Sequence, residues 1–79
     1  MKVEDIQTGM ILNWQSTTWP DKTSRWIVLG QIEKPHVEGK RFEIFCIKSD
    51  LDSGPTINQS TTYTFHHGNI HRFTIHSQI

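Results

Sequence analysis

Four histidines cluster near the end of this 79-residue chain, and imidazole is a common zinc ligand. They are His66, His67, His71 and His76. A zinc site needs three or four ligands that converge at about 2.0–2.1 Å. His66 and His67 are neighbours at the end of a predicted strand and point to opposite faces, so at most one can join His76. No cysteine or acidic residue lies between Tyr63 and Ile79. We therefore expect neither a metal site nor a cofactor.

The remaining reactive side chains form no catalytic pattern. Cys46, the one cysteine, lies in the apolar run Phe42–Ile47, where a small buried and unreactive side chain is expected. Nucleophilic catalysis would need a serine or cysteine held beside a histidine and an acid. The sequence shows no nucleophile elbow, glycine-rich phosphate loop or catalytic pair of carboxylates. It therefore predicts a protein that is not an enzyme.

Two tryptophans are the strongest candidates for contact with a protein partner. Trp14 ends a predicted strand, and Trp19 lies in a polar loop directly before Pro20. Tryptophan buries a large area with few rotatable bonds, and it is enriched among the residues that dominate interface affinity. With Arg25 at the far end of the loop, these residues form a candidate protein-binding site. Trp19 is expected either to anchor a partner or to cover the small core.

A second candidate surface would bind nucleic acid. It combines a ring for base stacking with basic or titratable side chains of the last two predicted strands, namely Tyr63, His66, Arg72 and His76. The formal net charge is zero, with 8 basic and 8 acidic residues. Affinity for phosphate backbones depends on several uncompensated basic side chains. This balance disfavours nucleic acid as the main partner.

The composition predicts strands rather than helices. Ile, Val and Thr fill 22 of 79 positions, while Ala is absent and Leu occurs three times. β-Branched side chains lose rotamer freedom in helices and suit a pleated surface. A chain of this length forms one domain, over residues 1–79, with a radius of gyration of roughly 12 Å when compact.

Five strands can be assigned from alternating apolar residues and from turn signals. They cover residues 10–14, 25–33, 41–48, 61–66 and 72–76. The side chains expected to face the core are Ile11, Val28, Ile44, Phe65, Phe73 and Ile75. Gly30 is expected at a bulge in the second strand. The second and third strands are apolar on both faces, so each must bury both faces or turn one toward a partner.

The order of these elements resembles the SH3-like barrel along nearly the whole chain. The resemblance rests on the spacing of Val3, Ile6 and Gly9 before the first strand and on the loop around Trp19. It also rests on the turn His67–His71, where such barrels place a 3₁₀ turn before the last strand. It implies an all-β, five-stranded antiparallel barrel, closed or partly open. An OB-type barrel is the competing architecture.

A small, non-catalytic chain of this kind resembles the accessory proteins that bacteriophages and mobile elements use to modulate one host protein. We therefore expect a protein-binding module, and the alternatives are nucleic-acid binding or an oligomer that sequesters a small molecule or nucleotide. Met1–Asp5 is charged where a signal peptide would begin its apolar region, and the longest apolar run, Trp26–Leu29, is too short to span a bilayer. We expect a cytoplasmic protein that does not enter a membrane.

Overall fold

A computed structural model describes residues 1–19, 21–33, 39–50 and 57–78. In chain order its elements are η1 (Val3–Asp5), β1 (Met10–Gln15), β2 (Thr23–Ile32), β3 (Lys40–Ser49), β4 (Ser60–Phe65), η2 (Ile70–Arg72) and β5 (Phe73–Gln78). The two η elements are single 3₁₀ turns, and the described residues contain no α-helix. Within these ranges, no helix has the length and apolar character needed to cross a bilayer. The predicted all-β class and the predicted order of five strands are confirmed.

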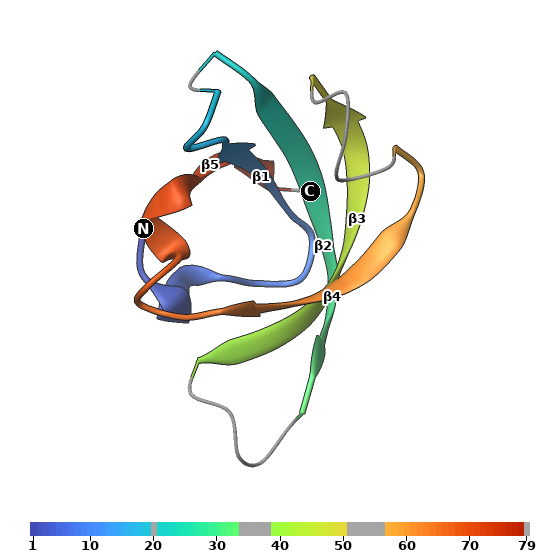
Figure 1. Ribbon diagram of the computed structural model, residues 1–79. Helices are drawn as coiled ribbons and strands as arrows, with labels where there is room; N and C mark the ends of the chain where they lie inside the picture. The colour runs from blue at the N-terminus through green and yellow to red at the C-terminus, as the bar shows by residue number, and fades with distance from the viewer. Residues whose placement is uncertain (20, 34–38, 51–56, 79) are drawn as a thin grey trace.

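The strands form one antiparallel sheet in the order β4-β3-β2-β1-β5. β1 pairs with both β2 and β5, so the last strand of the chain returns beside the first. The sheet curls around its inner face (Figure 1), but β4 and β5 do not pair with each other in the described residues. In the described residues the fold is therefore an open roll, and the closed form of the predicted barrel is not observed.

Aromatic rings, rather than a ladder of backbone hydrogen bonds, join the two edge strands. Phe65 of β4 lies edge-on to Phe73 of β5, with the ring centroids 5.0 Å apart. Tyr63 contacts Phe73 at 5.5 Å and Phe65 at 5.1 Å, again edge to face. Such pairs contribute about 0.5–1.5 kcal/mol each beyond their buried area. Side-chain packing thus takes the place of strand pairing between β4 and β5.

The core fills the inside of the roll. It consists of Ile6, Met10, Leu12, Trp26, Val28, Phe42, Ile44, Cys46, Phe65, Ile70 and Phe73. The two 3₁₀ turns help to close it, because Ile6 directly follows η1 and Ile70 begins η2. Cys46 is fully buried as expected, and this burial raises the pKa of its thiol. Of the six side chains predicted to face inward, four belong to this core.

The prediction is wrong for Ile11 and Ile75. In β1, Met10 and Leu12 face the core and Ile11 is half-buried on the other face. Three consecutive apolar residues begin this strand, so local alternation does not show which set faces inward. Only Phe73, at the start of the edge strand β5, reaches the core, and the rest of this strand is exposed, including Ile75 at 49%.

The bulge predicted at Gly30 is confirmed. The pairing of β2 with β3 shifts register between Val28 and Gly30, and a second shift lies earlier in β2, between Arg25 and Trp26. Bulges increase local twist and bend a strand. These two irregularities are consistent with the strong curl of the β2–β3 pair in Figure 1.

Candidate functional site

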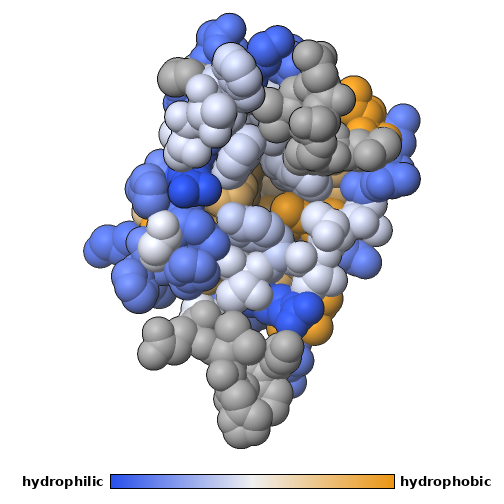
Figure 2. Space-filling model, viewed as in Figure 1, coloured by the Kyte–Doolittle hydropathy of each residue, from blue (hydrophilic) through white to orange (hydrophobic). Residues whose placement is uncertain are grey.

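A groove opens on the side of the roll where β4 and β5 are unpaired. Its volume is about 510 Å³, within the range of roughly 300–1,000 Å³ that is typical of ligand sites. One wall comes from β4 and the residue before it, and the other comes from β1, η2 and β5. Figure 2 shows hydrophobic residues at the bottom of a hollow on this side, with hydrophilic residues around it. We call this site the seam groove.

The floor of the seam groove consists of Ser24, Trp26 and Ile44, which belong to the inner face of the sheet. Trp26 is 8% exposed, and its indole Nε1–H donates a hydrogen bond of 2.8 Å to the Ser24 hydroxyl. The indole therefore needs no further acceptor. The floor is a fixed, mainly apolar surface that can support a ring or an aliphatic side chain.

The two walls differ in character. The β4 wall is mostly polar and comprises Gln59, Ser60, Thr61 and Tyr63. The opposite wall is formed by Trp14, Arg72 and Phe73. With Trp26 on the floor, four aromatic side chains surround the groove. Among the described residues that line it, Arg72 alone carries a charge.

Arg72 ends η2, immediately before β5. Its Nε atom is buried and has no hydrogen-bond partner among the described residues. Buried polar groups almost always have partners, and an unpartnered donor costs about 1–3 kcal/mol. Nε itself has almost no exposed surface, so an acceptor in the groove would bond to the rest of the Arg72 guanidinium.

Tyr63 and Arg72 influence each other across the groove. Burial raises the pKa of the Tyr63 phenol, and the positive charge of Arg72 acts in the opposite direction. Burial has the larger effect, so the phenol keeps its proton at neutral pH. The groove therefore offers a neutral hydroxyl donor on one wall and a guanidinium on the other.

A second hollow of about 460 Å³ adjoins the seam groove, and Trp14 and Arg72 line both. This basic hollow adds Arg25 and His71. Arg25 is held in place because its Nε donates a 3.1 Å hydrogen bond to the Asn13 side-chain oxygen. No acidic residue within the described ranges lines either hollow. An aromatic groove thus continues into a polar hollow lined by two arginines and a histidine.

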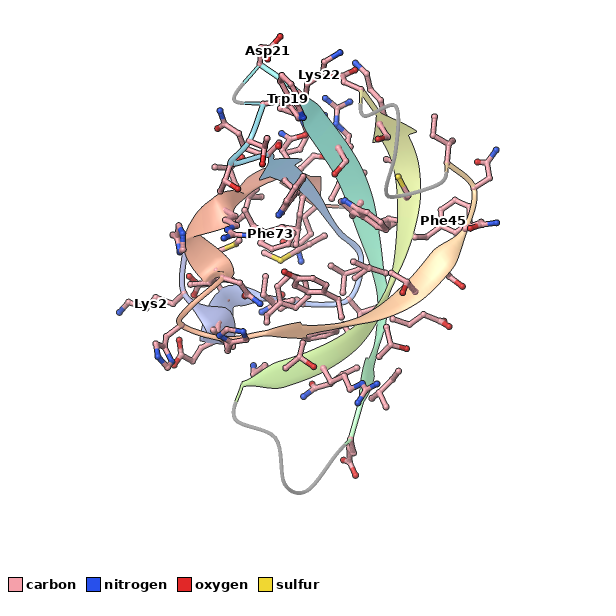
Figure 3. The ribbon with its side chains drawn as sticks, in the orientation of Figure 1. Lys2, Trp19, Asp21, Lys22, Phe45 and Phe73 are labelled. Atoms are coloured by element: carbon pink, nitrogen blue, oxygen red, sulfur yellow. The ribbon has the colours of Figure 1, made fainter. Side chains whose placement is uncertain are left out.

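The residues predicted to bind protein are only partly brought together. Trp14 and Arg25 line the basic hollow. Trp19 is 60% exposed and lies with Asp21 and Lys22 at the outer end of the loop, away from Phe73 (Figure 3). Trp19 is therefore no cover for the core, and it lines neither hollow. Pro20 lies outside the described residues.

The residues predicted to bind nucleic acid are divided as well. Tyr63 and Arg72 line the seam groove, whereas His66 and His76 do not. His66 belongs to the turn after β4, where its Nδ1 accepts a 3.0 Å hydrogen bond from the Gly68 N–H. His76 is exposed on β5. The structure joins half of each predicted set, and the sequence missed that Trp14, Tyr63 and Arg72 share one groove.

The four histidines near the end of the chain do not converge with other described ligands. In the parts of the chain that the structure describes, no three His, Cys, Asp or Glu side chains are arranged to hold a metal ion. Comparison with protein-family models, with curated proteins and with solved structures found no match. The function therefore has to be inferred from the groove itself.

Proposed function

We propose that this protein is a non-catalytic binding module that holds an extended segment of a partner protein in the seam groove. The observation that carries this proposal is Arg72, the one charged side chain among the described lining residues of an aromatic groove, whose Nε has no hydrogen-bond partner among the described residues. A carboxylate is the natural acceptor, because charge-assisted hydrogen bonds to guanidinium are stronger than neutral ones. The apolar floor at Trp26 would take an aromatic or aliphatic side chain of the same segment.

The two edge strands favour an extended peptide over other ligands. β4 and β5 flank the groove, and each has a neighbouring strand on one side only in the described sheet. An unpaired edge presents backbone donors and acceptors to which a peptide can add as a further strand. In such a strand alternate side chains point the same way, so one could enter the groove while another reaches Arg72.

Nucleic acid is the weaker alternative for the same groove. Trp14 and Tyr63 offer rings on which bases could stack. However, the two hollows together contain only Arg25, Arg72 and the titratable His71 among their described lining residues, and the formal net charge of the chain is zero. Phosphate backbones need more uncompensated positive charge than this for tight binding.

The fold is consistent with a small module that binds a peptide. We infer that the open roll is a variant of the SH3-like barrel, supported by the return of β5 beside β1 and by the η2 turn directly before β5. In this variant the ring contacts of Tyr63 and Phe65 with Phe73 take the place of the last strand pairing. The open seam would then be the feature that makes room for a ligand.

Selection from a displayed library of random linear dodecapeptides tests the proposed function. We expect enrichment of peptides that combine an aromatic or large aliphatic residue with Asp or Glu at a fixed spacing, and we expect micromolar affinity for the wild-type protein. A fluorescein-labelled oligothymidine, measured in the same buffer, should bind much more weakly. Tight binding of the oligonucleotide together with failure to enrich any peptide would replace the protein-binding proposal with the nucleic-acid alternative.

A further inference from the structure

The outer face of the sheet carries an apolar band that the seam groove does not use. Ile11, Ile27 and Phe45 are register partners on the adjacent strands β1, β2 and β3. Leu29 and Ile47, at the two register shifts of the β2–β3 pair, are 41% and 38% exposed. Figure 3 shows Phe45 on the outside of the roll, while Phe73 lies inside it.

This band is on the opposite side of the sheet from the groove. Trp26 and Ile44 line the groove, and their chain neighbours Ile27 and Phe45 point to the other face because strand side chains alternate. Ile11, Ile27 and Phe45 are half-buried, while Leu29 and Ile47 are exposed, and an apolar surface that stays accessible across adjacent strands commonly marks an interface. The outer band therefore predicts a second contact surface, separate from the proposed peptide site.

Charges of opposite sign lie at the two ends of the band. Arg25 and Lys48 are register partners on one side of the Ile27–Phe45 row, and Glu43 lies opposite Gly30 on the other side. Both Glu43 and Lys48 are exposed, and neither forms an ion pair with another described residue. Along β3 the outer face therefore carries the acidic Glu43 at one end and the basic Lys48 at the other, with the apolar Phe45 between them.

We propose that a second copy of this chain covers the band, so that the protein is a face-to-face homodimer. The two-fold axis would lie in the plane between the two sheets and run perpendicular to the strands. The β3 strands of the two copies are then antiparallel to each other. The two Phe45 side chains then meet at the centre, and Glu43 of each copy faces Lys48 of the other. Such an interface is isologous and self-complementary. A two-fold axis parallel to the strands would instead place Arg25 and Lys48 of one copy opposite Arg25 and Lys48 of the other. Repulsion between these like charges disfavours that arrangement.

The homodimer does not depend on the proposed function of the seam groove. Since the band and the seam groove lie on opposite faces of the sheet, dimerisation leaves both seam grooves open, and only Arg25 of the adjoining basic hollow lies at an end of the band. A dimer of this kind would present two peptide sites at once, which raises the apparent affinity for a partner that carries two copies of the segment.

Charge exchange at Glu43 and Lys48 tests the homodimer. Sedimentation equilibrium of the full chain, from micromolar to submillimolar concentration, should show a monomer–dimer equilibrium for the wild type. Glu43→Lys and Lys48→Glu should each weaken dimerisation at least about tenfold, because each places like charges opposite one another. The double variant, with both charges exchanged, should recover the wild-type dissociation constant.

Mixing the two single variants gives a control that does not require the double variant to fold. The Glu43→Lys chain carries lysine at both positions, and the Lys48→Glu chain carries glutamate at both. These two variants should form a heterodimer more tightly than either variant dimerises alone. Circular dichroism should show that both single variants stay folded, because both side chains are exposed. A wild-type protein that is monomeric throughout, or single variants that show no preference for each other, would overturn the proposal.

Discussion

The Phe65→Ala protein is expected to lose about 3–5 kcal/mol of its free energy of unfolding. Phe65 is fully buried, and its ring packs edge to face against Phe42, Tyr63 and Phe73, with centroid distances of 5.8, 5.1 and 5.0 Å. The substitution leaves a cavity and also removes the ring contacts between β4 and β5. Domains of this size have only a few kcal/mol of stability in total, so we expect a largely unfolded population at 37 °C.

Urea denaturation followed by tryptophan fluorescence measures this loss. Thr62→Ala is a matched control on the same strand, because Thr62 is exposed and its replacement should change stability by no more than about 0.5 kcal/mol. Phe65→Leu fills part of the cavity and should lose roughly 1–2 kcal/mol, which remains measurable if the alanine variant is unfolded. Equal midpoints for Phe65→Ala and Thr62→Ala would show that β4 does not close the core as described.

The Arg72→Gln protein is expected to bind the selected acidic peptides about 10- to 100-fold more weakly, as the loss of one charge-assisted hydrogen bond of about 1.5–3 kcal/mol requires. The peptide carboxylate would lose its partner, while the groove would keep its shape because glutamine retains much of the side-chain stem. The free protein should remain folded, since the buried Nε makes no hydrogen bond with a described residue. Isothermal titration calorimetry with one selected peptide measures the affinity.

Trp19→Ala is the control for this measurement, since it tests the loop that the sequence favours as the contact site. Trp19 is 60% exposed, so its replacement should change stability by less than about 1 kcal/mol. It should also leave peptide affinity within a factor of about two, because side chains outside an interface contribute little to its binding energy. A large loss of affinity for Trp19→Ala, with none for Arg72→Gln, would move the binding site to the loop.

The strands were predictable because the alternation of side chains is a local signal. Tyr63 and Phe65 alternate with threonines in β4, and Gly30 marks the bulge in β2, so both features could be located from the sequence. The inward face of β1 could not be predicted, since Met10, Ile11 and Leu12 are all apolar. The exposure of Ile75 follows from the position of β5 at the edge of the sheet, which depends on how the whole chain folds.

The candidate site was predictable residue by residue but not as an assembly. The sequence indicates Trp14, Tyr63 and Arg72 by residue type, yet it assigns them to two different surfaces. They line one groove because β5 returns to β1 while β4 stays unpaired on the other side. The unpartnered Nε of Arg72 is likewise a property of the packed structure, because burial decides whether water can reach a polar atom.

The indole N–H signals of the three tryptophans test the seam groove most directly. In ¹⁵N-labelled protein titrated with a selected peptide, we expect the Trp14 signal to shift strongly, because Trp14 forms a wall of the groove. The Trp26 signal, from the floor, should shift less because its N–H remains bonded to Ser24. The Trp19 signal should stay in place. A titration in which Trp19 shifts while Trp14 and Trp26 do not would contradict the seam groove as the binding site.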